Sequence, residues 1–435
     1  MKITIHRGAN QIGGCITEIQ SSKGDKILID FGHNLPEGDE TAEDMFDNLE
    51  DLQQLLHGVS DVYYTHYHGD HIAFEYEVYR AGVTQHIGEL SLTMVKTLKQ
   101  HMLHADSFKE RASKSLEALE HFKVYKPGST ETVGDIRITP YFVSHSAVDA
   151  YMFLIECDGV TILHTGDFRD HGYMGNGLEK NLIANIVPKQ IDVLVTEGTM
   201  LSRIAEKVPT EWDLQKKTID IFNKYKNAFV LCSSMDADRI VTFYQATRKQ
   251  KKYRWFVTDS YQGEQIRNIR MQLTGIYSDL CYGDILVQHD DVLAKMLENG
   301  FTMLVRNTDT FRKLLKEIMP HIDVQQTVFI YSQFEGYINK ALPTFKQSTY
   351  DFVHSYGWAV EHVHTSGHAS PQTLKKVCEL VRPSMAIIPI HKEKDSNFAE
   401  LQLDSNLQDK IVTQSKCFEK QLGNQKVMVE IEIKE

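Results

Sequence analysis

The chain has 435 residues, 42% of them hydrophobic and 24% charged, which is typical of a globular protein with two or three domains. The net charge of −12 argues against broad coating of nucleic acid, although it allows positive charge gathered in one cleft. The cysteines form no CxxC pair and no apolar run is long enough to span a bilayer, so we expect a cytoplasmic protein without a disulfide scaffold or a membrane partner.

Strand and helix patterns alternate along the chain, which predicts a layered α/β protein. In the first part, β-branched and aromatic runs predict strands at Lys2–His6, Cys15–Ile19, Lys26–Asp30, Val62–Thr65, Ile136–Val143, Met152–Glu156, Thr161–His164 and Asp192–Thr196. Helical spacing in the same part covers Thr41–Leu56, Ile72–Arg80, Ser91–His101 and Phe108–Leu119.

The pattern changes near Glu206, where a second α/β unit is predicted. Its helices are expected at Glu211–Tyr225, Asp238–Thr247 and Phe311–Met319, and its strands at Ala228–Ser233, Tyr253–Asp259, Phe301–Arg306 and Thr327–Tyr331. The earlier style then returns with a strand at Ala359–Thr365, a helix at Leu374–Val381 and a strand at Met385–Ile390. The boundaries predicted are 1–205, 206–360 and 361–435.

The strongest chemical signal is Thr65-His66-Tyr67-His68-Gly69-Asp70-His71, which brings together three imidazoles and a carboxylate. Neutral histidine and aspartate are ligands for zinc and similar ions, so the cluster can serve one metal or two. Alternate residues of an extended segment point the same way, so we expect His66 and His68 to converge on one ion. Asp70 and His71 fall at the turn into the next helix and can face a neighbouring ion. The alternative is a polar surface loop, which this density of histidines disfavours.

Further candidate ligands follow predicted strands. His145 and Asp167 each come just after a buried strand, His391 ends Ala386-Ile387-Ile388-Pro389-Ile390, and His368 lies in a Ser-Gly-His turn. Each of them taken alone is more often a surface or hydrogen-bonded residue than a ligand. Their shared position at strand ends is what a common site requires.

These residues together resemble the metallo-β-lactamase fold, and specifically its β-CASP branch of ribonuclease J-like RNA-metabolising hydrolases. The stretch from His66 to His71 fits the HxHxDH motif of the superfamily. The other motifs are matched, in chain order, by Asp30, His145, Asp167, Glu197, His368 and His391. The resemblance implies a four-layer αββα fold built by 1–205 and 361–435, with 206–360 inserted as an α/β cap domain over the metal cleft.

The resemblance also implies a dinuclear centre that holds two zinc ions, with manganese or magnesium as alternatives. His66, His68 and His145 would bind one ion, Asp70, His71 and His391 the other, and Asp167 would bridge them. The candidate catalytic residues are Asp70, His368 and Glu197. Asp30 and Glu197 would accept hydrogen bonds from ligand imidazoles, and His364 and Ser366 would contact a phosphate of the substrate.

The implied function is a zinc-dependent hydrolase of phosphodiester bonds, a ribonuclease that acts on single-stranded RNA through water activated by two metals. Histidine at the third β-CASP motif, here His391, is associated with the RNA-processing members. The alternatives are cleavage of DNA, hydrolysis of a small ester or lactone, and a metal-stabilised binding scaffold without turnover. Exonuclease and endonuclease modes both stay open, and a homodimer is one of the oligomeric states considered.

One charged run lies outside these motifs. Arg248-Lys249-Gln250-Lys251-Lys252-Tyr253-Arg254-Trp255 places five cations and two aromatics at the end of a predicted helix. Such a run could attract phosphates and stack a base. We favour the alternative, a solvated helix end whose aromatic side chains turn into the core.

Overall fold

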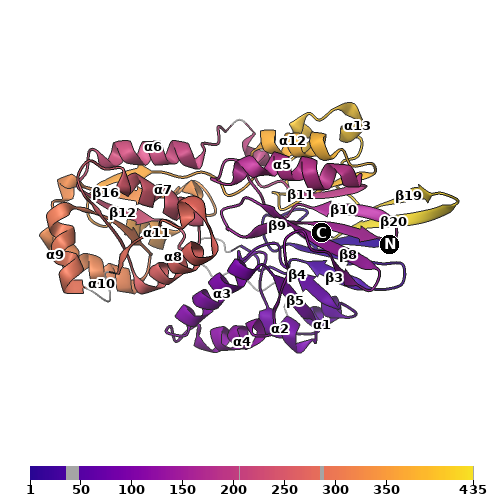
Figure 1. Cartoon of the computed structure of the whole chain (residues 1–435), viewed down its shortest axis with the longest axis horizontal. Coiled ribbons are helices and arrows are strands. Elements are labelled where there is room, and N and C mark those ends of the chain that lie inside the picture. Colours follow the sequence, from indigo (N-terminus) through magenta and orange to yellow (C-terminus); the bar gives the residue numbers. More distant parts are fainter. Residues whose placement is uncertain (36–48, 205, 285–288, 435) are drawn as a thin grey trace. The chain divides into compact units, whose positions relative to one another are not determined.

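The computed structural model describes residues 1–35, 49–204, 206–284 and 289–434. Two compact units account for the described chain, and Figure 1 shows the elements of both. The first unit comprises the described parts of 1–35, 42–207 and 367–435, and the second comprises the described parts of 208–366. The second unit is therefore an insertion in the sequence of the first.

The first unit contains an 8-stranded sheet in which strands from both ends of the chain are neighbours. Its order is β19 (Lys416–Leu422), β20 (Gln425–Ile433), β1 (Lys2–Arg7), β2 (Ile16–Gln20), β3 (Lys26–Ile29), β4 (Asp61–Tyr63), β5 (Thr84–Ile87) and β6 (Lys123–Val124). The parallel pairing of β1 with β20, with Ile3 opposite Ile431, ties the first and last strands together.

The second sheet of this unit is 6-stranded and supplies most of the strand ends at which candidate ligands lie. Its order is β18 (Ala386–Ile390), β11 (Val193–Glu197), β10 (Val160–His164), β9 (Ala150–Cys157), β8 (Ile136–Val143) and β7 (Glu131–Val133). The strands β10, β11 and β18 run parallel, so their carboxyl ends meet at one edge of the sheet.

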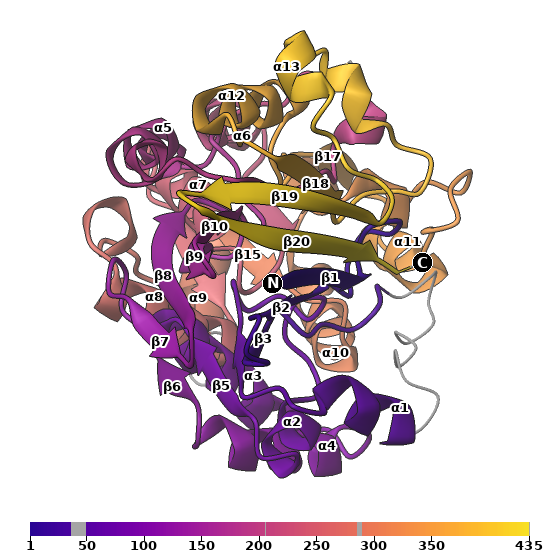
Figure 2. The ribbon, with the colours of Figure 1, turned by 90° about the vertical axis from the view of Figure 1, so that its right-hand side faces the viewer.

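The two sheets pack face to face, and helices cover their outer faces. Isoleucines such as Ile29 from the first sheet and Ile388 from the second share one buried core, in which each contributes about 1.5–3 kcal/mol. Figure 2 shows one set of helices below the sheets and the other set above them. They are α1 (Leu49–Leu56), α2 (Glu75–Arg80), α3 (Glu89–Met102) and α4 (Lys109–Leu119), and then α5 (Leu178–Asn181), α12 (Pro371–Val381) and α13 (Ser405–Gln408). This is the predicted αββα arrangement.

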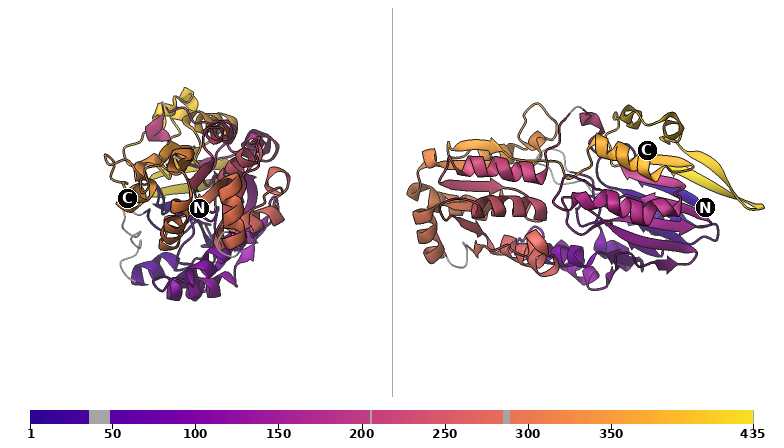
Figure 3. Two further views of the ribbon diagram at one scale, coloured as in Figure 1. Left: turned by 90° about the vertical axis from the view of Figure 1, so that its left-hand side faces the viewer. Right: turned by 45° about the horizontal axis from the view of Figure 1, so that its top comes forward.

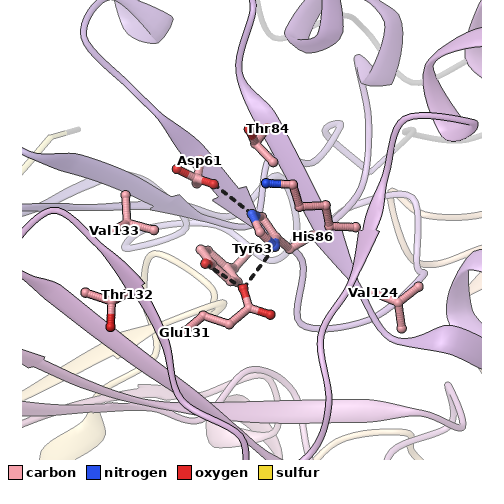
Figure 4. Close-up of a pocket in the computed structure, with 9 residues that line it drawn as sticks. Asp61, Tyr63, Thr84, His86, Val124, Glu131, Thr132 and Val133 are labelled. Atoms are coloured by element: carbon pink, nitrogen blue, oxygen red, sulfur yellow. Dashed lines mark hydrogen bonds and ion pairs between the residues drawn. The ribbon is translucent and has the colours of Figure 1, made fainter.

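Polar side chains also join the two sheets at the edge where β6 and β7 lie. His86 on β5 lies between Asp61 and Glu131, with its Nε2 atom 2.7 Å from Asp61 Oδ1 and its Nδ1 atom 3.1 Å from Glu131 Oε2. The Tyr63 hydroxyl donates to the same Glu131 oxygen (Figure 4). These groups line an open pocket of about 660 Å³. Because Glu131 belongs to β7 and the others to the first sheet, the cluster links the sheets.

The second unit is a parallel α/β layer structure. Its 6-stranded sheet has the order β14 (Gly283–Asp284), β13 (Trp255–Thr258), β15 (Phe301–Val305), β12 (Asn227–Leu231), β16 (Thr327–Tyr331) and β17 (Ala359–His362). The helices that flank this sheet (Figure 3) are α6 (Glu211–Phe222), α7 (Ala237–Arg248), α8 (Ser260–Gln272), α9 (His289–Asn299), α10 (Asp309–Ile318) and α11 (Gln347–Val353).

Several predicted elements differ from the structure. The helix predicted from Ile72 begins at Glu75, because Ile72 pairs with Phe31 in an isolated bridge. Of the helix predicted at Thr41–Leu56, residues 41–48 lie outside the described residues and Leu49–Leu56 is helical. No described helix is both long and apolar enough to cross a lipid bilayer.

Candidate metal centre

The histidine-rich stretch lies in a bend, not in the extended strand that the sequence suggested. Strand β4 ends at Tyr63, and residues 64–71 form bends and turns before the next element. Backbone hydrogen bonds fix this loop: Cys15 N and Phe31 N donate to the carbonyls of Asp70 and His71. A Cβ atom at Gly32 would overlap the Asp70 carbonyl, so the loop can approach this closely only at a glycine.

Three imidazoles converge in spite of the bend. The Nε2 atoms of His66 and His145 each lie 3.1 Å from Nδ1 of His68. His68 therefore faces the cluster with Nδ1, whereas His66 and His145 face it with Nε2. This difference explains how their nitrogens meet although the residues do not lie on one face of a strand. The three nitrogens all lie within 4.8 Å of one another, a spacing that suits ligands of a single ion.

Hydrogen bonds on the far side of the rings fix their tautomers. His145 Nδ1 lies 2.7 Å from the carbonyl oxygen of Gly367, which can only accept, so the proton is on Nδ1 and the lone pair of Nε2 faces the cluster. His66 Nδ1 lies 3.0 Å from the Thr65 hydroxyl, which itself donates to Asp30. Burial lowers the pKa of His68 to about 4 and that of His66 and His145 well below their usual value, so all three are neutral ligands at pH 7.

A second group of donors surrounds Asp70. His71 Nδ1 donates to Asp30 Oδ2 at 2.8 Å, and His391 Nδ1 lies 2.7 Å from the Thr199 hydroxyl. The Nε2 atom of His391 lies 3.2 Å from Asp70 Oδ2, and that of His71 lies 3.9 Å from the same oxygen. Asp30 and His391 both adopt a left-handed φ directly after a strand, a strained conformation that is common at functional sites.

Asp167 lies between the two groups. Its Oδ2 atom is 3.1 Å from Nε2 of His71, 3.6 Å from that of His391 and 4.0 Å from that of His145. Burial opposes ionisation of this carboxyl, but the neighbouring imidazoles, His391 first, outweigh it and hold the Asp167 pKa well below its usual value. A single carboxylate oxygen thus faces nitrogens of both groups.

The residues present fit a divalent metal centre. The buried Nε2 atom of His71 makes no hydrogen bond in the described structure, although its Nδ1 atom is fully engaged with Asp30. Burial disfavours a charged His71, yet the carboxylates of Asp167, Asp30 and Asp70 raise its pKa well above the usual value, which shows that the cluster attracts positive charge. Convergent nitrogen lone pairs beside ionised carboxylates are the donor set that zinc and similar ions prefer.

His368 borders this cluster and pairs with Glu197. The His368 Nδ1 atom lies 3.1 Å from Glu197 Oε2 and 3.1 Å from the Thr199 hydroxyl. Burial alone would lower the pKa of His368, but Glu197 and Asp167 raise it, so the ring tends to carry a proton. The side chain is 21% exposed, which allows a substrate to reach it. The sequence argument expected Glu197 to orient a ligand imidazole, whereas its imidazole partner in the structure is His368.

Sequence reasoning missed two residues at this centre. Thr199 donates to the carbonyl oxygen of His391 and accepts from the ring of the same residue. In the sequence it is only a neighbour of Glu197. Cys15 forms a group with His71 and His391 whose ligand atoms lie within 4.8 Å of one another. Burial raises the pKa of the Cys15 thiol well above its usual value, so it is a weaker ligand than ionised Asp70. No local pattern marks Cys15.

The predicted phosphate contacts His364 and Ser366 belong to the second unit. Arg239 donates to Nδ1 of His364 at 3.0 Å, and because a guanidinium can only donate, the His364 proton lies on Nε2. Arg239 is in turn held by both carboxylate oxygens of Glu211 and by the Ser332 hydroxyl, in a fully buried network. The ring of His364 is therefore oriented as an N–H donor, and its contact with a substrate stays a prediction.

Comparison with known proteins shows which folds and sequences this chain resembles. Residues 16–179 match the metallo-beta-lactamase superfamily. A solved structure of a protein of unknown function from Enterococcus faecalis V583 superposes with a TM-score of 0.67 at 16% identity, and covers 98% of this chain and 99% of that one. The fold is therefore shared over essentially the whole chain, as predicted.

Two named relatives extend the comparison. Ribonuclease J of Helicobacter pylori is 24% identical over 412 residues, which is 90% of this chain and 56% of the relative. Endoribonuclease ysh-1 of Neurospora crassa is 30% identical over 235 residues, or 50% of this chain and 26% of the relative. The chain thus spans about half the length of the first relative and about a quarter of the second. These similarities confirm the predicted resemblance to the metallo-β-lactamase fold and its β-CASP branch.

Proposed function

We propose that this metallo-β-lactamase-fold chain is a metal-dependent ribonuclease that hydrolyses phosphodiester bonds of single-stranded RNA. The observation that carries the proposal is the position of Asp167, one oxygen of which lies 3.1 Å from His71 Nε2 and 4.0 Å from His145 Nε2. A carboxylate between two groups of imidazoles suits a pair of dications, and such pairs support displacement at phosphorus in many nucleases and phosphatases.

In this proposal His66, His68 and His145 would hold one ion, Asp70, His71 and His391 would hold the other, and Asp167 would serve both. The nitrogen-rich donor set favours zinc, and manganese or magnesium could replace it. The metal pair, when bound, would lower the pKa of a water molecule and neutralise charge that develops on the phosphate.

The protein residues hold and move the protons. Asp70 stays ionised, because His71 and His391 outweigh its burial and hold its pKa below the usual range, so it can accept a proton from water. The carboxylate of Glu197 raises the pKa of His368 and so favours its protonated form, which can donate a proton to the leaving oxygen. Glu197 also accepts from the backbone N–H groups of Phe168 and Ala369, which fixes the carboxylate that orients His368.

Support for RNA as the substrate comes from the relatives and from one motif. The two relatives described above are named as ribonucleases. His391 takes the third β-CASP position, where histidine accompanies RNA processing. DNA cleavage and the hydrolysis of small esters or lactones are the alternative activities with which RNA cleavage must be compared.

The test uses purified full-length protein loaded with zinc and single-stranded RNA labelled at either the 5′ or the 3′ end, with monophosphate and triphosphate 5′ ends. The proposal expects cleavage that is lost on chelation and in His68→Ala, and kept in His57→Ala, which removes an exposed histidine of the same unit. Product lengths from the two labels separate exonuclease from endonuclease action. Metal-loaded protein that cleaves DNA or a chromogenic ester but not RNA would overturn the proposal.

A further inference from the structure

The charged run after α7 forms the solvated helix end that its sequence suggested, since Arg248, Lys251 and Lys252 are exposed, but its aromatic side chains differ from the expectation. Tyr253 is 65% exposed and does not turn into the core, while the neighbouring Trp255 begins β13 and is half-buried. The two rings meet edge to face with centroids 5.5 Å apart. The expectation that both aromatics pack inward is therefore wrong for Tyr253.

These aromatics line a pocket of about 570 Å³ within the second unit. Tyr282 also lines this pocket and is 37% exposed. Its ring is seated against α8, because a Cβ atom at Gly263 would overlap the Tyr282 ring. Exposed aromatic rings around one pocket offer flat faces on which a planar base can stack.

The same pocket is positively charged. Arg248, Lys252 and Arg254 line it, and none of its described lining residues is acidic, although the chain as a whole carries a net charge of −12. Arg254 is buried and stacks on Phe222, with its Cζ atom 4.4 Å from the ring centroid. It donates to the backbone carbonyls of Phe222 and Tyr225 and forms no ion pair with any described carboxylate, so its charge is only partly compensated.

Two buried donors in the pocket wall add to this character. Arg254 Nη1 and Trp255 Nε1 have no hydrogen-bond partner among the described residues. Unpaired buried donors are destabilising unless a ligand or solvent supplies an acceptor. Burial lowers the pKa of Arg254 to about 10, which still leaves the guanidinium charged at neutral pH.

From these observations we infer that the pocket lined by Lys252, Tyr253 and Tyr282 is a binding subsite for single-stranded RNA, in which a base stacks on the aromatic rings and the adjoining phosphate faces the cations. This inference deepens the proposed function and rests on it for the choice of RNA over other anions. The combination of cations with exposed aromatics is the one that single-stranded nucleic acid requires, since every base offers a face for stacking and every nucleotide a negative charge.

The experiment measures binding without cleavage. Full-length protein in chelator is titrated into a fluorescein-labelled oligouridylate, and binding is followed by fluorescence anisotropy. Tyr253→Ala and Tyr282→Ala are each expected to weaken binding roughly fivefold or more, and Tyr253→Phe, which keeps the ring, to bind like the unmodified protein. Lys252→Ala should reduce the slope of log affinity against log salt by about 0.7.

Matched controls separate the pocket from general charge. Lys313→Ala and Lys316→Ala remove exposed cations on α10 of the same unit and should leave affinity within about twofold. An abasic strand of equal length should be bound equally by the Tyr253→Ala variant and the unmodified protein, because only stacking is removed. Unchanged oligouridylate affinity in both tyrosine variants would overturn the inference, as would an equal loss in the α10 controls.

The binding and cleavage measurements distinguish a wrong subsite from a wrong proposed function. Protein that cleaves RNA but binds it equally well with Tyr253→Ala and Tyr282→Ala keeps the proposed function and loses the subsite. Protein that cleaves no RNA, yet loses oligouridylate affinity in the tyrosine variants alone, keeps the subsite and loses the proposed function. The tyrosine variants are compared with the unmodified protein by thermal unfolding, and matching transitions confirm that each is folded.

Discussion

Replacement of Asp30 by asparagine tests how the centre is built. Asp30 is completely buried and accepts three hydrogen bonds: from Thr65 N at 2.7 Å, from the Thr65 hydroxyl at 2.8 Å and from His71 Nδ1 at 2.8 Å. An asparagine side chain has only one acceptor oxygen. Its NH₂ group must therefore face either the Thr65 N–H or the His71 N–H, and two donors oppose each other.

The expected magnitudes follow from that mismatch. One buried donor left without an acceptor lowers the free energy of unfolding of the metal-free protein by about 1–3 kcal/mol. If His71 changes tautomer to relieve the clash, its Nε2 atom becomes protonated and can no longer bind a metal. Loss of such an orienting carboxylate typically weakens metal binding by about 10- to 100-fold.

The assay combines urea unfolding of the metal-free protein with zinc titration against a competing chelator. Asp192→Asn is the control, since buried Asp192 also accepts from a backbone N–H, that of Thr161, and from a hydroxyl, that of Ser384, and it pairs in addition with Lys420. It should lose stability to a similar degree and bind zinc normally. Normal zinc affinity in Asp30→Asn, or an equal loss of affinity in Asp192→Asn, would refute the reasoning.

Three further predictions concern other parts of the molecule. His68→Ala should lower the zinc content measured by elemental analysis from about two ions per chain to about one, and retention of two ions would show that His68 is not a ligand. Burial lowers the pKa of His68 from 6.5 to about 4, so the unfolded chain takes up the proton at a higher pH than the folded chain. The stability of the metal-free protein should therefore decline as pH falls through this interval. Urea unfolding at several pH values checks this, and His68→Gln should make the decline shallower. Arg239→Met should cost about 3–5 kcal/mol in urea unfolding, because it removes the guanidinium that compensates the buried charge of Glu211, whereas Arg267→Met, at an exposed ion pair, should cost less than about 1 kcal/mol.

Local sequence patterns predicted most of the strands and missed one hairpin. Strands such as Ile136–Val143 and Thr327–Tyr331 were predicted with their observed bounds, because they are buried apolar runs. The hairpin β19–β20 was missed, although Val429, Ile431 and Ile433 alternate with glutamates along β20 as expected of a half-buried strand. The two-residue turn at Gly423 and Asn424, across which Leu422 pairs with Gln425, was a further signal.

The candidate site was predictable where its residues lie in motifs and not where only the fold brings them together. His66, His68 and His145 were expected to share one ion, and the structure brings their nitrogens together by a bend rather than by strand alternation. Thr199 reaches His391 across 192 positions in the sequence, a contact that no local pattern contains. Tyr253 shows the opposite case, because a short-range pattern suggested burial and the packing of β13 left the ring exposed.

In the proposed reaction, water held at this centre attacks phosphorus directly. Cleavage of single-stranded RNA in water enriched in heavy oxygen, followed by mass spectrometry of the products, shows whether water is the attacking group. We expect one heavy oxygen atom in the phosphate of the product, and continued cleavage when the 2′-hydroxyl at the scissile nucleotide is replaced by hydrogen. A cyclic phosphate product without heavy oxygen would contradict the proposed reaction, because the attacking group would then be the RNA hydroxyl and not water.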